Sequence, residues 1–214
     1  MNENVWQSFN IDKGGNRNVF ALDSNNYPIV AWEDHYAIKL LKWNGECWIG
    51  IGGSDSESGL SQSGNANLPF DMAVNQYDNI FVTYVDRTIG TWCTYLKYWD
   101  GSNWTGLDDS DKDGGLGIHQ GYAYIALKKD GWPILAWSEG NRVICKEWTG
   151  NKWINLASNI DGTVYSGYDY CQLYGIYLTN DNYPTLCWSD GDIFSSSREY
   201  FCKKMEWHNM DQYR

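Results

Sequence analysis

The sequence predicts an all-β protein in which one four-strand unit is repeated four times. Two observations carry this prediction. The 214-residue chain is rich in residues that favour strands and tight turns, with 16% aromatic side chains and 22 glycines but only 4 prolines. It also repeats itself, because four similar segments recur about 52 residues apart, at 20–34, 72–86, 125–139 and 176–190.

The first segment of each unit predicts two strands joined by a turn rich in Asn, Asp or Gly. Its most regular column holds a large aromatic residue: Trp32, Tyr84, Trp137 and Trp188. The strand that carries this residue, 29–32 in the first unit, shows only weak polar and apolar alternation. We therefore expect that strand to be buried on both faces.

A second motif, W-x-G-x-x-W, predicts the third and fourth strands of each unit. Its first column holds Trp43, Trp99, Trp148 and Trp207, and its second holds Trp48, Trp104 and Trp153. Between the two columns, Gly45, Gly101 and Gly150 supply the positive φ that a tight hairpin requires. Four strands in each unit of about 50 residues predict a four-bladed β-propeller with four antiparallel strands per blade.

We expect one propeller domain over residues 1–214, with blades at about 18–52, 68–108, 121–157 and 171–214, the last completed by 1–10.

The last unit has no second tryptophan after Trp207, whereas Trp6 and Phe9 repeat the spacing of Trp48 and Ile51. An N-terminal strand would thus complete the last blade and remove an open sheet edge. The same strand could instead insert into a neighbouring molecule and build a polymer.

The repeat resembles the aromatic-rich propeller repeats of bacterial proteins, which include lectins of the tachylectin and fucose-binding types. In having four units, the chain is also similar to the propeller subunits of extracellular tubular filaments, and in blade count alone to hemopexin-type rings. The resemblance extends from Trp6 to Trp207. It implies the fold more strongly than the function.

Charge and hydropathy restrict the possible partners. A formal net charge of −11 disfavours nucleic acid and anionic membranes, which are bound through clustered Lys and Arg. The sequence has neither an apolar run of about 18 residues nor a signal peptide at its start. We expect no membrane insertion, and we suspect an extracellular or cell-surface location.

One acidic residue follows the aromatic column of every unit: Asp34, Asp86, Glu139 and Asp190. Four carboxylates on one face could collect a cation or a hydroxylated ligand. Alternatively, each could accept hydrogen bonds from backbone amides in the turn that follows.

An aromatic residue follows the turn of three units: Tyr27, Trp132 and Tyr183, with Asn79 in the second unit. Aromatic faces beside Asn and Asp suit a sugar ring, so these three residues are candidates for sugar binding. The alternative is that each only shields a hairpin.

The segment 109–114 matches the opening of a calcium loop, with Asp109, Asp111 and Asp113 as candidate ligands. The match ends there, because Gln120 stands where such loops carry a bidentate Glu. The alternative is that this segment and 54–59 are solvated acidic loops, and no other cofactor is expected.

The six cysteines form no CxxC pair, which argues against zinc-ribbon and thioredoxin-like sites. Cys187 falls in a column of small residues, so we expect a structural thiol there. A disulfide from Cys171 to Cys202 or Cys187 within the last blade remains open.

The sequence shows no catalytic motif, and the three histidines, His35, His119 and His208, occupy unrelated positions. We therefore expect a non-enzymatic propeller that assembles with copies of itself as an extracellular structural subunit. The alternative is a propeller lectin that binds surface glycans.

Overall fold

The computed structural model describes residues 18–61, 66–87, 89–117, 122–139, 142–157, 171–191 and 198–204. Every regular element within these ranges is a β-strand. The predicted closing strand at 1–10 and the last tryptophan, Trp207, lie outside the described residues.

The strands form four antiparallel sheets in chain order. Sheet 1 contains β1 (Asn18–Leu22), β2 (Pro28–Asp34), β3 (Ala37–Trp43) and β4 (Trp48–Gly50). Sheet 2 contains β5 (Ala66–Val74), β6 (Ile80–Asp86), β7 (Cys93–Trp99) and β8 (Trp104–Thr105). Sheet 3 contains β9 (Tyr124–Leu127), β10 (Pro133–Glu139), β11 (Arg142–Trp148) and β12 (Trp153–Ala157). Sheet 4 contains β13 (Cys171–Leu178), β14 (Pro184–Gly191) and β15 (Arg198–Lys204).

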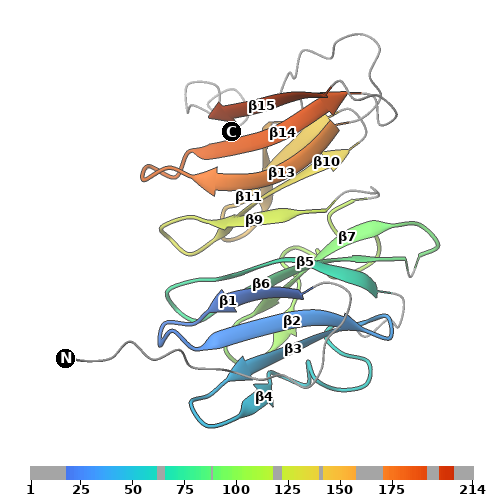
Figure 1. Cartoon of the computed structure of the whole chain (residues 1–214), viewed down its shortest axis with the longest axis vertical. Helices are drawn as coiled ribbons and strands as arrows, with labels where there is room; N and C mark the ends of the chain where they lie inside the picture. The colour runs from blue at the N-terminus through green and yellow to red at the C-terminus, as the bar shows by residue number, and fades with distance from the viewer. Residues whose placement is uncertain are drawn as a thin grey trace.

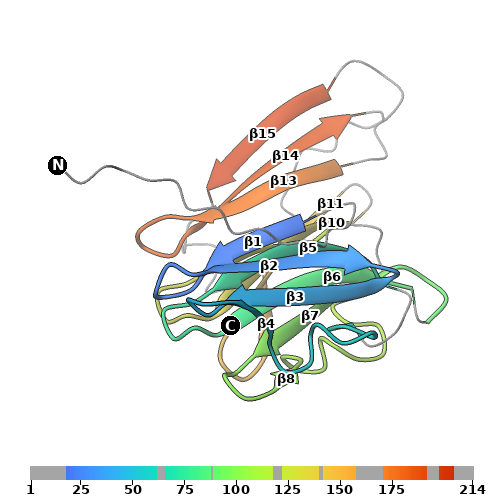
Figure 2. The ribbon, with the colours of Figure 1, turned by 60° about the horizontal axis from the view of Figure 1, so that its bottom comes forward.

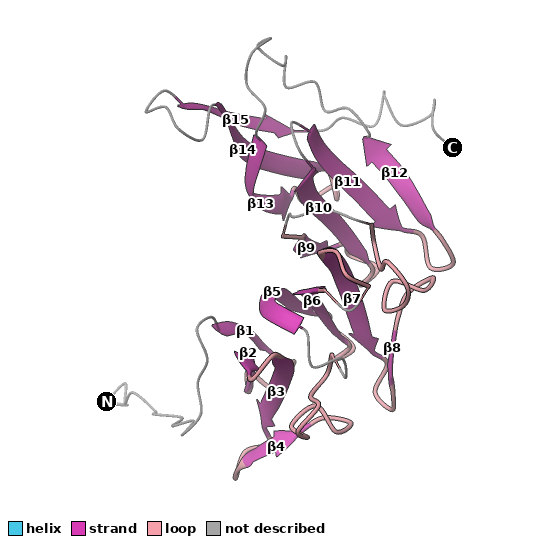
Figure 3. Cartoon of the chain, turned by 90° about the vertical axis from the view of Figure 1, so that its right-hand side faces the viewer, coloured by secondary structure: helices cyan, strands magenta, loops and turns pink. Residues whose placement is uncertain are grey.

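The sheets stack in the order of the sequence, from sheet 1 in blue to sheet 4 in red (Figure 1). Viewed from the side they follow an arc, with sheets 1 and 4 at its two ends (Figure 3). The first strands, β1, β5, β9 and β13, contact one another in succession. This is the blade arrangement of a β-propeller, as the repeats predict.

Three apolar clusters fill the spaces between successive sheets. In the predicted aromatic column, Tyr84, Trp137 and Trp188 belong to these clusters, and all four residues, Trp32 included, are 2% exposed. Such burial of large aromatic side chains is the main stabilising contribution to a small-sheet protein. The prediction that this column is buried in four like sheets is confirmed.

Local turn chemistry explains the hairpins of the second motif. Gly45, Gly101 and Gly150 have φ of 104°, 100° and 99°, as predicted. The tryptophan after each hairpin reaches the preceding sheet: Trp104 Nε1 donates to the Ile51 carbonyl at 2.7 Å. Trp153 Nε1 likewise donates to the Leu107 carbonyl at 2.9 Å. The fourth strand thus ties each sheet to the loop before it.

The two acidic loops, 51–61 and 107–117, are each anchored at a buried serine. Ser54 is 1% exposed, and its hydroxyl donates to the Leu40 carbonyl at 2.8 Å. Ser110 is equally buried and donates to the Leu96 carbonyl at 3.0 Å. Leu60 and Leu116 pack into the core below. Most of the acidic residues of both loops are exposed, as the alternative of solvated acidic loops expects, and one buried serine ties each loop to the third strand.

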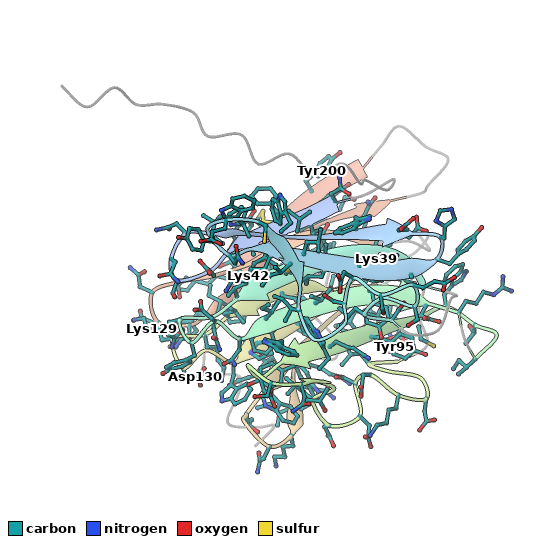
Figure 4. The ribbon with its side chains drawn as sticks, turned by 90° about the horizontal axis from the view of Figure 1, so that it is seen from below. Lys39, Lys42, Tyr95, Lys129, Asp130 and Tyr200 are labelled. Atoms are coloured by element: carbon teal, nitrogen blue, oxygen red, sulfur yellow. A yellow bond between two sulfur atoms is a disulfide. The ribbon has the colours of Figure 1, made fainter. Side chains whose placement is uncertain are left out.

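Hydrogen bonds between turns connect neighbouring sheets at one end of the molecule, where Lys129 and Asp130 lie (Figure 4). Ser24 donates to Asp78 through its backbone amide at 2.7 Å and its hydroxyl at 2.8 Å. Asn75 Nδ2 donates to the Gly131 carbonyl at 3.2 Å, and the Lys129 amide donates to Asn182 Oδ1 at 3.0 Å. We call these contacts the turn belt.

Two buried ion pairs occupy equivalent places in sheets 1 and 3 with the charges exchanged. Asp23 pairs with Lys42 at 2.8 Å, from the turn to the third strand. Lys128 pairs with Glu147, also at 2.8 Å. Burial alone would raise the pKa of Asp23, but hydrogen bonds from Lys42 and from backbone amides outweigh burial and lower the pKa.

Sheet 4 departs from the repeat in its register. β14 and β15 place Cys187 opposite Cys202, whereas the equivalent pair in sheet 1 is Ala31 and Leu40. The alignment of the second motif would place Lys204 opposite Cys187, so the observed pairing is shifted by two residues. The placement of Trp207 in the column of Trp43 stays a prediction.

A disulfide joins Cys187 to Cys202 across these two strands. The expectation of a free thiol at Cys187 is wrong, because antiparallel pairing brings directly opposed side chains within bonding reach. Cys47, Cys93, Cys145 and Cys171 are free.

Removing this disulfide should destabilise the protein. The bond closes a loop with a sequence separation of 15, for which loss of the crosslink costs about 3 kcal/mol. We expect Cys187→Ala with Cys202→Ala to lower the free energy of unfolding by that amount in urea titrations. Adding reductant should shift the midpoint of the natural chain but not that of the double variant. Equal midpoints for the natural chain with and without reductant would contradict the prediction.

Candidate functional site

A cavity of about 480 Å³ opens between the loop 51–61 of sheet 1 and the outer strands of sheet 2. Its walls come from that loop, from β7 and β8, and from the next acidic loop. The lining residues used below are Gly52, Lys97, Trp99, Asn103, Trp104 and Asp111. We call this cavity the Lys97 pocket.

The ammonium group of Lys97 is the unusual feature of this pocket. The residue is only 8% exposed, yet among the described residues it makes no hydrogen bond and no ion pair. Burial lowers the pKa of Lys97, and the negative charge of Asp111 opposes that shift. The ammonium nitrogen is not among the fully buried atoms that lack a partner, so it is accessible from the pocket. A largely buried lysine with a lowered pKa at a pocket wall is a candidate ligand-binding group.

Sheet 3 shows why Lys97 is left without a partner. Its equivalent there is Lys146, whose Nζ lies 5.6 Å from the centre of the Trp137 ring. Sheet 2 has Tyr84 in place of Trp137, and Tyr84 stacks with Tyr95 at a ring separation of 5.5 Å. The Tyr84 ring thus packs against Tyr95, and Lys97 has no indole beside it in the position that Trp137 occupies beside Lys146.

Two indole rings form the apolar side of the pocket. Trp99 and Trp104 lie 5.4 Å apart with their planes at 49°. Trp104 is held by its hydrogen bond to Ile51. Gly52 has φ of 57°, and any Cβ there would collide with the Trp99 ring. The loop therefore needs glycine at this position to pack against the indoles.

The polar side of the pocket offers both donors and an acceptor. Asp111 folds back against Gly106, where a Cβ would collide with its carboxylate. Asn103 follows the hairpin, and its backbone amide donates to Asp100 at 2.7 Å. With Lys97 as a cationic donor, Asp111 as an acceptor and two indoles, the pocket has the groups that hold a hydroxyl-rich ligand.

Titration of Lys97 gives a pH-dependent prediction. The pKa of Lys97 is lower in the folded protein than in the unfolded chain, so the unfolded chain binds the proton more readily. The free energy of unfolding should therefore rise with pH between the folded pKa and the unfolded pKa of about 10.4. Lys97→Met removes this proton, so it should stabilise the protein by about 1 kcal/mol near pH 7. In thermal melts, that gain should shrink towards pH 10.4. A gain that is constant with pH would contradict it.

The three aromatic candidates for sugar binding pack against neighbouring side chains, Tyr27 and Tyr183 on their own sheets and Trp132 on both sheet 3 and sheet 2. Tyr27 lies over Gly45 of the hairpin in sheet 1. Trp132 lies 5.8 Å from Tyr98 and 6.5 Å from Trp148, and Tyr183 lies 5.0 Å from the Lys204 ammonium, each measured to ring centres. These contacts match the hairpin-shielding alternative, and sugar binding at these residues stays a prediction.

The repeated acids have different surroundings from one sheet to the next. Asp34 Oδ1 lies 2.6 Å from His35 Nδ1, and its other oxygen lies 3.2 Å from Lys39 Nζ. These contacts lower the pKa of Asp34. Asp86 is 3% exposed, whereas Glu139 is partly exposed and lies 3.9 Å from Arg142. The side chain of Asp190 lies outside the described residues.

The proposed calcium loop has no supporting geometry. Asp109 forms an ion pair with Lys112 at 2.8 Å, and Asp111 turns towards Gly106. Across the described ranges, no three His, Cys, Asp or Glu side chains gather closely enough to hold a metal ion. Calcium binding at Asp109, Asp111 and Asp113 gains no support from this arrangement.

Comparison with solved structures identifies the fold. The chain is similar to an endo-arabinase from Bacteroides thetaiotaomicron, with a TM-score of 0.51 and 12% identity over 87% of this chain and 74% of that one. A glycosyl hydrolase from Bacteroides ovatus matches with a TM-score of 0.47 and 14% identity, covering 86% and 64%. A fucose lectin from Kordia zhangzhouensis has a TM-score of 0.42 and 14% identity, covering 67% and 99%.

No family model matches the chain, and no curated protein matches it. At 12% identity, the likeness to the endo-arabinase shows the β-propeller fold alone. Among the described residues, no helix is long and apolar enough to span a membrane.

The prediction that the chain is not an enzyme is corrected by this comparison. A solved endo-arabinase has the same fold. Propellers assemble acid and base groups from distant loops, so the missing linear motif could not exclude catalysis.

Proposed function

We propose that this chain is a carbohydrate-binding β-propeller that holds a glycan in the Lys97 pocket. The observation that carries the proposal is Lys97, a largely buried lysine whose ammonium has no hydrogen-bond or ion-pair partner among the described residues and lines a pocket with two indoles. Sugar hydroxyls would accept hydrogen bonds from this ammonium, and the indoles would cover the apolar face of the ring. The likeness to an endo-arabinase supports a carbohydrate ligand.

The charged side chains that line the pocket balance, with one Lys97 ammonium and one Asp111 carboxylate, which favours a neutral sugar over an acidic one. Asp111 lines the same cavity and would repel a carboxylate, while it can accept hydrogen bonds from hydroxyls. The chain as a whole carries a formal charge of −11, which also opposes anionic ligands.

The experiment begins with a glycan array on the natural chain, followed by calorimetry with the best neutral oligosaccharide. Lys97→Met should weaken binding at least about tenfold, since one charged hydrogen bond contributes about 1.5–3 kcal/mol. Lys146→Met is the matched control, because Lys146 occupies the same position in sheet 3 but lies over Trp137. It should leave the affinity unchanged. Undiminished binding by Lys97→Met would refute the pocket as the site.

We further propose that the protein works outside the cell or at its surface. The Cys187–Cys202 disulfide supports this location, since disulfides persist in oxidising compartments.

Self-association as an extracellular structural subunit is a second candidate role. The observation in its favour is that sheets 1 and 4, at the ends of the arc, each expose large apolar side chains on one face. Light scattering across a range of protein concentrations tests this role, which requires the average mass to rise with concentration.

A further inference from the structure

The three interfaces between sheets follow one rule along the first strand. Met72, Ile125 and Ile176 each pack towards the preceding sheet and are at most 8% exposed. The next column of the repeat contains Ala21, Ala73 and Ala126 in sheets 1 to 3, and these alanines pack towards the following sheet. Each interface therefore joins an aliphatic side chain of one sheet to an alanine side of the sheet before it.

Within the described residues no sheet precedes sheet 1, and two of the corresponding side chains on its first strand are exposed, whereas Trp32 on the same face is buried. Phe20 occupies the column of Met72 and is 75% exposed. Leu22 occupies the column of Val74 and is 51% exposed. Exposed pairs of large apolar residues on one strand face indicate an interaction surface more than a solvated one. We call Phe20 and Leu22 the sheet 1 face.

Within the described residues no sheet follows sheet 4, and three tyrosines on its outer face are exposed. Tyr177 stands in the alanine column and is 70% exposed. Tyr200 is 72% exposed and lies 6.1 Å from Tyr174, which is 41% exposed, between ring centres. Tyrosine is enriched in protein interfaces. We call these three tyrosines the sheet 4 face.

We propose that the sheet 1 face of one copy binds the sheet 4 face of a second copy, head to tail. The repeat itself supports this pairing. At the three interfaces within the chain, the column that contains Phe20 in sheet 1 packs against the alanine column of the sheet before it. In sheet 4 that alanine column contains Tyr177. The apolar side chains of both faces are exposed at once, and the two sheets stand at opposite ends of the arc (Figure 3). Figure 2 shows β1 and β13 from a second direction. The inference rests on self-association, the second candidate role.

The size of the side chains favours a joint between copies over one within the chain. An internal joint equivalent to the other three would have to accommodate Tyr177 where they hold alanine, and Phe20 where they hold Met or Ile. Overpacking of this kind is costly in a closed interface. Between two separate copies, the angle between the sheets is not fixed by closure of the propeller. The interface can therefore adjust to accommodate the side chains of both Phe20 and Tyr177. Such a heterologous contact produces rings or open chains.

The test uses one variant for each face. Phe20→Glu disables the sheet 1 face and Tyr177→Glu the sheet 4 face, and each variant keeps the other face intact. We expect the natural chain to self-associate in analytical ultracentrifugation and each variant alone to be monomeric. An equimolar mixture of the two variants should form a heterodimer, since one intact joint remains between them. Tyr77→Glu changes an equally exposed ring, 69% exposed, in a turn and should behave as the natural chain.

Three results would overturn the inference, and only the first of them would also refute self-association. A natural chain that stays monomeric at all concentrations would refute self-association as well. Association that both variants retain would refute this interface alone. A natural chain that associates, with monomeric variants whose mixture stays monomeric, would show that the two faces do not bind each other, since closure within one chain would leave the natural chain monomeric. Near-ultraviolet circular dichroism of each variant shows whether it has kept its native packing.

Discussion

Lys128→Met should lower the free energy of unfolding by about 3–4 kcal/mol, because it leaves Glu147 buried without its cation. Lys128 and Glu147 are each 8% exposed, and their charged atoms lie 2.8 Å apart. Against a typical stability of about 5–15 kcal/mol, this loss is large enough to place the variant near unfolding at moderate urea concentrations. Urea titration followed by tryptophan fluorescence measures it.

Sheet 1 provides the matched control for this variant. It carries the same ion pair with the charges exchanged, as Asp23 and Lys42. Lys128→Asp combined with Glu147→Lys should therefore recover most of the lost stability. Asp23 also accepts hydrogen bonds from two backbone amides of its turn, whereas in sheet 3 the Trp132 amide already donates to Asp130, so the recovery should be incomplete. A double variant no more stable than Lys128→Met would show that the two sites are not equivalent.

Trp137→Ala should destabilise the protein by about 3–5 kcal/mol, the usual cost of emptying a buried tryptophan site. The ring is 2% exposed and belongs to the cluster between sheets 2 and 3. Its removal would also leave the Lys146 ammonium without the ring that it faces at 5.6 Å. Differential scanning calorimetry should show the shift in melting temperature.

Trp137→Tyr is the informative control, because sheet 2 already has Tyr84 in the same column at 2% exposure. We expect this variant to lose clearly less stability than Trp137→Ala. Equal losses would mean that the column does not tolerate exchange between repeats, contrary to the repeat argument.

The sequence predicts the parts of the fold that each repeat determines locally. The buried column from Trp32 to Trp188 and the hairpins at Gly45, Gly101 and Gly150 depend on residues close together in the chain. The disulfide was not predictable in its pairing, since it depends on the register of β14 and β15. That register departs from the repeat, so alignment of the units could not supply it.

The Lys97 pocket was missed for a related reason. Its groups come from β7, from the loop of the preceding sheet and from the next acidic loop, so no linear motif contains them. One signal was present in the sequence. Lys97 and Lys146 share a column in strands that otherwise pack apolar side chains, while their aromatic neighbours differ as Tyr84 and Trp137. A comparison of the lysine column together with the aromatic column would have shown that Lys97, unlike Lys146, has no tryptophan in its unit's aromatic column.

The turn belt joins each sheet only to its immediate neighbours, through Asp78, Gly131 and Asn182. Sheets 2 and 3 are therefore secured on both sides, whereas within the described chain sheets 1 and 4 are secured on one. In such a nearest-neighbour array, partial opening begins at the termini and moves inward. The molecule would consequently fray from its outermost repeats long before its central pair separates.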